Sequence, residues 1–362
     1  MPLRVPEIVS PAILIDAEKM EANLCRMQAL CDAAGVELWP HIKTHKLVPI
    51  LRRQLELGAR GATCAKIGEA EAMLPSGVRR IFIAHSLGDL SKAPRLRALR
   101  ENLDELILAV TSEAHCEALE AILAAADLRV PILMAVDSGL AREGSRGPAA
   151  AAALAAKIRR SSRMNLIGLY THEGHSYLSE SVEKVRERAE DVHRILAECA
   201  EAAGGGLPLW PGCSVTAALM AGKPGVHAVR PGAYVFGDLF LSEVNAVMLP
   251  EQVAVSVLAT VVDRPADDLA LIDAGSKVFS SDKTAGGLTA RETQIPGVDV
   301  VKLSEEHGFV RGSGVPALAI GRRLFFRPAH VCPVMNLAPN VYLVKGDEVL
   351  DIWPVDARGR SD

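Results

Sequence analysis

The sequence predicts an α/β protein that consists of a TIM-type (β/α)8 barrel followed by a β-rich domain near the C-terminus. Short runs rich in Val, Ile and Leu alternate with segments of helical periodicity, and this alternation repeats eight times over about 200 residues. After about residue 240 the pattern changes to alternating apolar and polar residues, which is typical of strands. Eight strand and helix repeats favour a closed barrel over an open doubly wound sheet, which usually has fewer strands.

The expected elements follow one another without an internal repeat or a low-complexity linker. Strands are expected near residues 36–40, 61–64, 81–84, 106–110, 131–137, 166–171, 208–212 and 226–230. Helices are expected at 17–34, 46–57, 112–125, 148–160 and 180–203. Because a helix separates the segment AILID at 12–16 from the first barrel strand, this segment is expected to pair into the β-rich domain. We therefore predict a barrel at 15–240 and a β-rich domain formed by 1–14 and 241–362.

The composition favours a small molecule as the partner of this chain. Its 362 residues carry a net charge of -4, and acidic and basic residues alternate along the helices instead of forming blocks. Such a pattern speaks against binding to nucleic acid or to a membrane. The N-terminus lacks a long apolar segment, no run approaches the ~18 apolar residues of a membrane span, and the seven cysteines lack the spacing of a disulfide framework. A cytoplasmic location is therefore expected.

The segment PHIKTHK at 40–46 follows the first expected strand and contains Lys43 and Lys46. An isolated lysine is usually a solvated surface cation. At the mouth of a barrel, however, an amine can lose solvent, which lowers its pKa until it serves as a nucleophile and a base. We therefore predict that Lys43 carries chemistry, whereas Lys46 begins the next helix as an ordinary lysine.

Two segments of small residues, which follow the last two strands, predict a phosphate-binding cup. GCSVT at 212–216 opens a helix after the seventh strand, where barrel enzymes commonly hold a phosphate on backbone N–H groups. RPGAYVFGD at 230–238 follows the eighth strand and adds a glycine that lets the backbone approach a ligand.

The sixth strand ends in an unusually polar segment, GLYTHEGHSY at 168–177. Within six residues it contains four polar side chains, His172, Glu173, His175 and Tyr177. A core or capping role would explain one of these side chains but not all four. Asp137 and Arg142, which follow the fifth strand in VDSGLAREG at 136–144, form either a structural salt bridge or a part of the same site.

The segment RPAHVCPVMNL at 327–337 places His330 and Cys332 two residues apart between prolines. On an extended segment such residues point to the same side, so that an imidazole and a thiolate can bind one cation. Two protein ligands leave positions open for substrate and water, which suits catalysis better than a structural role. The thiolate favours zinc over a harder ion.

In this order, the motifs resemble those of fold-type III pyridoxal-phosphate enzymes, in particular the D-threonine aldolase and D-serine dehydratase branch with its alanine racemase-like barrel. The resemblance covers nearly the whole chain, and PHIKTHK looks like the lysine motif of that branch. It implies that the catalytic Lys43 holds pyridoxal 5'-phosphate as a Schiff base and that His172 packs on the cofactor ring. It also implies that Arg230 faces the pyridine nitrogen. The cofactor-binding residues that it implies are Lys43, Arg142, His172, Tyr177, Gly212, Ser214, Thr216, Arg230, Gly232 and Tyr234.

His330 and Cys332 are similar to the metal pair of this branch, and His330 is also assigned a catalytic role. Dehydratases of the branch have His-x-Cys and many aldolases have His-x-Asp, whereas the downstream Pro333, Asn336 and Leu337 look more like the aldolases. The resemblance thus implies pyridoxal phosphate and a divalent metal, zinc or manganese, as cofactors.

The function that the resemblance implies is a lyase for D-β-hydroxy amino acids, similar to D-threonine aldolase, that forms glycine and an aldehyde by retro-aldol cleavage. The alternative is a D-serine dehydratase, which would form pyruvate and ammonia. An amino-acid racemase would need a second base opposite Lys43, and a non-catalytic pyridoxal-phosphate carrier is typically the barrel alone, so both are less favoured. The resemblance further implies a homodimer in which the β-rich domain of one subunit covers the barrel mouth of the other.

Overall fold

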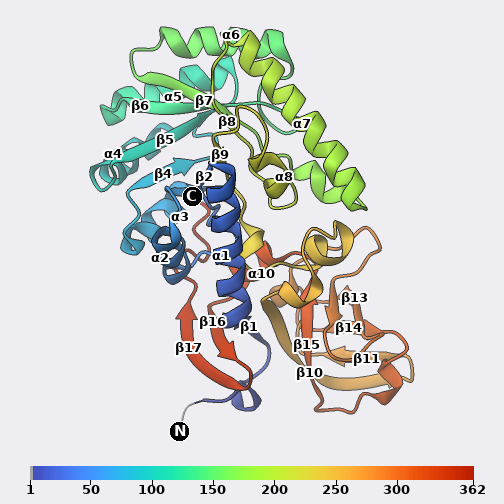
Figure 1. Ribbon diagram of the computed structural model, residues 1–362. Helices are drawn as coiled ribbons and strands as arrows, with labels where there is room; N and C mark the ends of the chain where they lie inside the picture. Colours follow the sequence, from blue (N-terminus) through green and yellow to red (C-terminus); the bar gives the residue numbers. More distant parts are fainter. Residues whose placement is uncertain (1–2) are drawn as a thin grey trace. The chain divides into compact units, whose positions relative to one another are not determined.

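The computed structural model describes residues 3–362, and the chain folds into two units (Figure 1). The barrel unit contains Cys25–Lys43, Val48–Gly232 and Arg360–Asp362. The β unit contains the residues up to Leu24 together with Thr44–Leu47 and Ala233–Gly359. The chain therefore passes between the units several times, and helix α1 (Ala17–Ala34) begins in the β unit and ends in the barrel unit.

The eight strands of the barrel unit run parallel and close into a ring. They are β2 (Glu37–Leu38), β3 (Ala62–Cys64), β4 (Arg80–Ile83), β5 (Glu105–Val110), β6 (Val130–Ala135), β7 (Met164–Tyr170), β8 (Leu209–Trp210) and β9 (Ala228–Val229). Strands β3 to β8 form one sheet, and β2 pairs with β9. Bridges between His41 and Thr63 and between Leu209 and Val226 join the two sheets on either side. The expected (β/α)8 barrel is therefore confirmed.

The strands of the barrel unit alternate with helices, and some of these helices start at local capping signals. The helices are α2 (Val48–Leu57), α3 (Ile67–Met73), α4 (Ala93–Glu101), α5 (Glu113–Ala126), α6 (Pro148–Arg160), α7 (Val182–Ala202) and α8 (Ala217–Ala221). The hydroxyl of Ser112 accepts from the N–H of His115 at α5, and the hydroxyl of Ser181 accepts from the N–H of Lys184 at α7. Helix α6 starts at Pro148, where the missing N–H costs no hydrogen bond.

The barrel interior is packed with side chains and leaves the rim for a site. The buried members are Trp39, Phe82, Ile107, Ala109, Leu133, Ala135, Tyr170, Trp210 and Ala228. Trp39 meets Trp210 edge-on at 5.0 Å between ring centroids, and Phe82 meets Tyr170 in the same way at 5.1 Å. A filled interior is usual for this fold, whose ligands bind at the carboxyl ends of the strands.

The β unit is built around a mostly antiparallel sheet. Its strands are β1 (Ala12–Asp16), β10 (Val255–Ala266), β11 (Leu269–Ile272), β12 (Ala290–Glu292), β13 (Asp299–Leu303), β14 (Gly308–Arg311), β15 (Arg323–Pro328), β16 (Asn340–Lys345) and β17 (Glu348–Pro354), with the short helices α9 (Ser276–Phe279) and α10 (Val331–Leu337). The strand order is β11-β14-β13-β12-β15-β10-β1-β16-β17, and β11 also pairs with β10, so that part of the sheet closes into a small barrel.

Strand β1 joins this sheet between β10 and β16. It pairs antiparallel with β10, with Ile13 opposite Val257, and parallel with β16, with Leu14 opposite Tyr342. The expectation that the segment at 12–16 pairs into the β-rich part is therefore confirmed.

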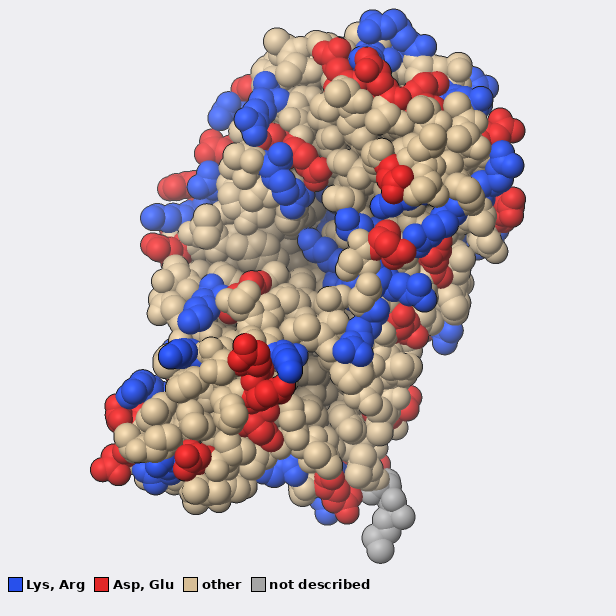
Figure 2. Space-filling model, turned by 180° about the vertical axis from the view of Figure 1, so that it is seen from behind, with Lys and Arg blue, Asp and Glu red and all other residues tan. Residues whose placement is uncertain are grey.

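Side chains of both charges cover the surface shown in Figure 2. Lys and Arg are interspersed with Asp and Glu on this face, as expected from 40 basic and 44 acidic residues in the sequence. Among the residues that the structure describes, no helix is both long and apolar enough to cross a membrane.

Candidate active site

Parallel strands bring their carboxyl ends to one rim of the barrel unit, and the polar motifs follow these ends. Lys43 lies after β2, His172 after β7 and Arg230 after β9. Lys43 is half-buried and lies close enough to His172 and Cys213 for its charge to act on both groups. The structure thus brings the predicted lysine and imidazole together.

The ring of His172 is held as a neutral imidazole in one tautomer. Its Nδ1 lies 2.6 Å from the carbonyl oxygen of Gly212, and because a carbonyl oxygen only accepts, Nδ1 donates this hydrogen bond. Burial, and then the nearby Lys43 ammonium group, lowers the pKa of His172 to about 3. Near neutral pH the ring therefore carries no charge and can pack on another aromatic ring.

Arg230 supplies a fixed, charged donor at the same rim and is only 3% exposed. Its Nη2 donates to the carbonyl oxygen of Thr171 at 2.6 Å, and its Nε donates to that of Trp210 at 3.2 Å. The guanidinium carbon lies 5.3 Å and 5.2 Å from the ring centroids of Phe82 and Tyr170. Burial lowers the pKa of Arg230 to about 10, so the group stays charged at neutral pH.

The loops after β8 and β9 meet beside Arg230. A Cβ atom at Gly212 would lie 2.4 Å from Nη2 of Arg230, so a larger residue does not fit there. The N–H of Gly232 donates to Oγ of Ser214 at 3.0 Å, which fixes the two loops to each other. The two predicted glycines and Ser214 therefore lie at the rim as expected for a phosphate cup.

Glu173 is a buried carboxyl group that the sequence analysis noted in its polar segment but left out of the site. Its Oε1 accepts from the hydroxyl of Thr216 at 2.7 Å, and its Oε2 accepts from the N–H of Gly212 at 3.1 Å. Burial raises the pKa of Glu173, and its charge interacts with that of Arg230. The hydroxyl of Thr216, a predicted cofactor ligand, thus holds Glu173 and supports the loop.

Replacing Glu173 with alanine is expected to lower the free energy of unfolding by about 3–5 kcal/mol, because Arg230 loses a buried counter-charge. Glu173→Gln should cost less, since an amide oxygen can still accept from the N–H of Gly212. Urea unfolding of the purified protein measures both, and Glu180→Ala, at an exposed glutamate shortly after the segment 168–177, serves as the control. Equal unfolding midpoints for the alanine variants of Glu173 and Glu180 would contradict this role.

Arg142 and Asp137 do not form the salt bridge that was one of the two alternatives. Asp137 Oδ2 accepts from Nε of Arg146 at 3.1 Å, whereas Nη2 of Arg142 donates to Oε1 of Glu143 at 3.2 Å. Arg142 is exposed, yet its charge acts on His172 at the rim. The assignment of Arg142 to cofactor binding stays a prediction.

The two predicted tyrosines lie in 3-10 turns. Tyr177 is half-buried in the turn Gly174–Leu178 of the barrel unit. Tyr234 is buried in the turn Ala233–Val235 of the β unit. Their assignment to cofactor binding stays a prediction.

The prediction for Lys46 was wrong, because this residue is not an ordinary lysine at the start of a helix. Lys46 is 5% exposed with a φ of 56°, and helix α2 begins only at Val48. Its Nζ donates to the carbonyl oxygen of Ala357 at 3.2 Å, and its own carbonyl oxygen accepts from the N–H of Ala357 at 3.1 Å. A buried amine needs such a partner, so Lys46 has a structural role within the β unit.

His330 and Cys332 lie at the start of helix α10 in the β unit, and the expectation of an extended segment was wrong. His330 is the N-cap residue, and Cys332 lies in the first turn, where Pro333 is tolerated because its missing N–H needs no partner. The side chains of His330 and Cys332 nevertheless meet in a hydrogen bond. Thr44, which follows Lys43 in the chain, places its Oγ1 3.2 Å from Sγ of Cys332.

Two carboxyl groups that the sequence analysis missed act on His330. Nδ1 of His330 donates to Oδ2 of Asp282 at 2.7 Å, and the N–H of Val331 donates to Oδ2 of Asp238 at 3.1 Å. Burial lowers the pKa of His330, but Cys332 and both carboxyl groups outweigh it and raise the pKa to about 11. In the part of the chain that the structure describes, no group of three or more His, Cys, Asp and Glu side chains is arranged to hold a metal ion. A metal would therefore rely on the two predicted ligands.

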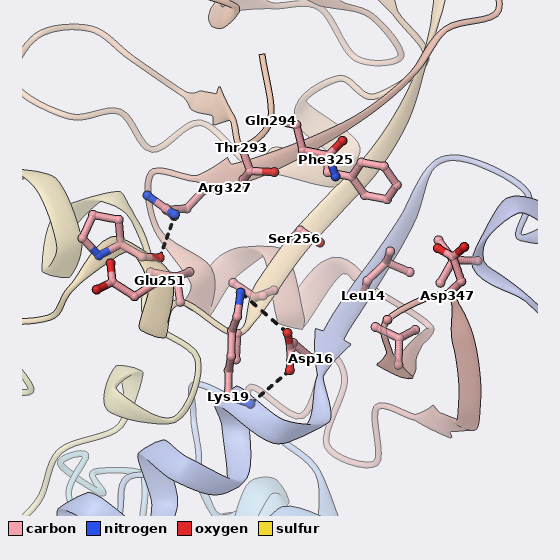
Figure 3. Close-up of a pocket in the computed structure, with 17 residues that line it drawn as sticks. Leu14, Asp16, Lys19, Glu251, Ser256, Thr293, Gln294, Phe325, Arg327 and Asp347 are labelled. Atoms are coloured by element: carbon pink, nitrogen blue, oxygen red, sulfur yellow. Dashed lines mark hydrogen bonds and ion pairs between the residues drawn. The ribbon is translucent and has the colours of Figure 1, made fainter. Parts of the chain in front are cut away.

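A pocket of about 670 Å³ in the β unit is lined by none of the predicted site residues (Figure 3). On its wall, Nζ of Lys19 lies 3.6 Å from Oδ2 of Asp16, and Nη2 of Arg327 donates to the carbonyl oxygen of Pro250 at 2.8 Å. Its residues are thus distinct from those of the candidate site.

A ring of eight parallel strands with a lysine, a neutral imidazole and a buried arginine at its rim defines the class of the fold-type III pyridoxal-phosphate enzymes. Comparison with protein families agrees with this class. Residues 15–239 match the family described as alanine racemase, N-terminal domain, and residues 254–344 match the putative serine dehydratase domain. The chain belongs to the family with the alanine racemase N-terminal domain, and the resemblance found in its sequence is confirmed.

Two relatives that match nearly the full chain are named as an aldolase and a dehydratase. D-threonine aldolase from Arthrobacter sp is 30% identical over 97% of this chain and 93% of its own length. D-threo-3-hydroxyaspartate dehydratase from Delftia sp. (strain HT23) is 32% identical over 95% of this chain and 96% of its own length. The crystal structure of D-threonine aldolase from Filomicrobium marinum has a TM-score of 0.91 at 25% identity and covers 100% of this chain and 98% of its own.

One solved structure of the D-threo-3-hydroxyaspartate dehydratase is that of a mutant in which a cysteine is replaced by alanine. This mutant is in the metal-free form. This structure has a TM-score of 0.85 at 30% identity and covers 96% of this chain and 97% of its own. A second mutant of this dehydratase replaces a histidine two positions before that cysteine. The predicted lyase of the alanine racemase-like fold is thus confirmed at the level of the family.

Proposed function

We propose that this protein is a pyridoxal-phosphate- and divalent-metal-dependent lyase that cleaves D-β-hydroxy amino acids to glycine and an aldehyde. The observation that carries the proposal is the pair His330 and Cys332 in a chain that also has Lys43 at a barrel rim. A metal ion that binds the β-hydroxyl group assists a reaction at Cβ. A racemase acts only at Cα and has no such use for a metal.

The barrel rim fits pyridoxal phosphate, because Lys43, the neutral imidazole of His172 and the buried guanidinium of Arg230 all follow strand ends at this rim. When bound, this cofactor stabilises negative charge at Cα of an amino acid. Lys43 would hold it through Nζ, and neutral His172 would pack on its ring. Arg230 would donate an N–H to the pyridine nitrogen and keep its own proton, so the nitrogen would stay unprotonated. Ser214 and Gly232 would bind the phosphate group.

The side chains of His330 and Cys332 in the β unit fit a divalent metal, because an imidazole nitrogen and a thiolate are the donors that zinc prefers. When bound, such an ion lowers the pKa of an oxygen ligand, here the β-hydroxyl of the substrate. Manganese is the alternative ion. The metal-free cysteine mutant of the D-threo-3-hydroxyaspartate dehydratase supports the role of Cys332, because the histidine and cysteine replaced in that enzyme have the spacing of His330 and Cys332.

Dehydration to a keto acid and ammonia is the second candidate reaction. Cys332 favours it, because the relative whose cysteine is replaced by alanine in the metal-free mutant is a dehydratase. In this reaction Lys43 would take the proton from Cα, whereas in retro-aldol cleavage the β-hydroxyl group loses its proton while the Cα–Cβ bond breaks. Both reactions need the same contact between metal and hydroxyl.

Incubation of the purified holoenzyme with D-threonine, D-serine and D-threo-3-hydroxyaspartate tests the proposal. We expect glycine and an aldehyde as products, and the L-enantiomers should not react. Keto acid and ammonia in place of aldehyde would select the dehydratase. Racemisation of the D-substrates without cleavage or ammonia release would overturn the proposed function.

We further propose that residues 15–240 act as the cofactor-binding barrel and that residues 1–14 and 241–362 carry the metal pair. As the resemblance implies, the protein would act as a homodimer, and its proposed location is the cytoplasm. Its partner would be a small D-amino acid.

A further inference from the structure

The imidazole of His330 forms a hydrogen bond to the carboxylate of Asp282 through one of its nitrogens. Nδ1 lies 2.7 Å from Oδ2 of Asp282, and because a carboxylate only accepts, Nδ1 carries the proton. In a neutral ring, Nε2 is then the nitrogen with the lone pair. Asp282 therefore selects the tautomer in which Nε2 can act as a ligand.

The remaining surroundings of His330 hold its ring and backbone in place. The ring meets Phe240 edge-on at 6.1 Å between centroids with an interplanar angle of 86°. Asp238 is completely buried, and its carboxylate accepts from the N–H of Leu241 at 3.1 Å and from that of Val331 at 3.1 Å. These bonds fix the backbone directly after His330, so the hydrogen bonds of its side chain to Asp282 and Cys332 set the rotation of the ring.

The segment that presents Asp282 has a strained backbone. Ser280 has a φ of 67° and a ψ of -166°, a region that is nearly restricted to glycine. This residue ends helix α9 and turns the chain toward Asp282. The turn holds the carboxylate two residues later within reach of the imidazole.

We propose that Asp282 is a positioning residue that orients His330 as a ligand of a divalent metal ion. The inference rests on the proposed metal-dependent function and deepens it. A histidine that binds a metal usually donates its other N–H to a carboxylate, which fixes the ring and makes the ligand more basic. Loss of such a partner typically lowers metal affinity about 10- to 100-fold.

An ordinary surface ion pair is the competing interpretation of this contact. The side chains of His330 and Asp282 are 30% and 44% exposed, and an exposed pair contributes little to stability. Substitution of Asp282 should therefore leave the protein folded. Its effect on metal binding can then be measured apart from any effect on the fold.

The experiment measures zinc affinity of the chelator-treated holoenzyme by competition with a chromophoric chelator. We expect Asp282→Ala to weaken zinc binding about 10- to 100-fold. Asp282→Asn should retain part of the affinity, because its amide oxygen can still accept from Nδ1. The matched control is Asp268→Asn at an exposed carboxylate of the same unit, which pairs with Arg311 and should bind zinc like the wild type. The cofactor absorption band and the thermal midpoint report that each variant is folded.

His330→Ala separates the two possible failures. If this variant loses zinc whereas Asp282→Ala binds as tightly as the wild type, the role of Asp282 is refuted and the metal site stands. If His330→Ala binds zinc like the wild type, the metal assignment itself fails, and the inference fails with it. Weaker binding by both variants, with Asp268→Asn unchanged, supports the proposal.

Discussion

Replacement of Lys43 by alanine is expected to remove the visible absorption band of bound pyridoxal phosphate and to lower lyase activity by at least about 10⁴-fold. The reason is that the Nζ atom would both attach the cofactor and transfer protons, and each role alone contributes several orders of magnitude. Absorption spectra and product assays on the purified variant measure the two effects. A variant that retains the band would refute the assignment of Lys43.

Lys46, the second lysine of the same motif, provides the matched control. It is buried and donates to the carbonyl oxygen of Ala357, so Lys46→Met should lower the free energy of unfolding by about 1–3 kcal/mol. The cofactor band should remain. Borohydride reduction of the wild type followed by peptide mapping should label Lys43, and a label on Lys46 would reverse the roles of the two lysines.

The sequence was sufficient to predict the barrel, because its signals are local. Most of the parallel strands are largely buried and therefore read as short apolar runs, although β2 contains the half-buried Glu37 and is only two residues long. Helices α5 and α7 begin at hydroxyl caps and α6 begins at a proline, and such signals are visible as single residues. The start of α10 was not predicted, since the two prolines around His330 and Cys332 suggested an extended segment.

The rim residues were predictable for a related reason. All strands of the barrel are parallel, so a polar residue just after an apolar run must lie at the same rim as the others. This rule found Lys43, His172 and Arg230. It does not apply in the β unit, where the sheet is mostly antiparallel and its strand ends do not meet at one edge.

The supporting carboxyl groups could not be assigned from the sequence, because their roles depend on contacts between distant segments. Asp282 lies 48 positions before His330, and Asp238 lies 93 positions before Val331. No periodicity connects such pairs. Glu173 gave a partial signal as part of a polar segment, but its bond to Thr216 across 43 positions became visible only in the structure.

Removal of the metal is expected to lower lyase activity by about 10³-fold while the cofactor band stays in place. A bound divalent ion contributes several kcal/mol to the stabilisation of charge on a substrate oxygen, and each 1.36 kcal/mol is about a factor of ten in rate. Cys332→Ala should behave like the chelated enzyme, because it removes one of the two protein ligands. Cys25→Ala, at an exposed cysteine, is the control and should retain full activity. Undiminished turnover by rigorously metal-free enzyme would refute the metal assignment.

Cys332→Asp should differ from the alanine variant, because a carboxylate remains a ligand but prefers harder ions. We expect zinc to restore little activity to this variant and manganese to restore most of it. If the hardness of the ligand helps to select the reaction, the product ratio should also shift toward aldehyde and away from keto acid, which the product assay measures. Thr44 directly follows Lys43 in the chain, and its hydroxyl lies 3.2 Å from Sγ of Cys332. The variant Thr44→Ala tests whether metal binding by His330 and Cys332 depends on this contact. Restoration of Cys332→Asp by zinc and manganese to the same level would show that the thiolate does not set the metal preference.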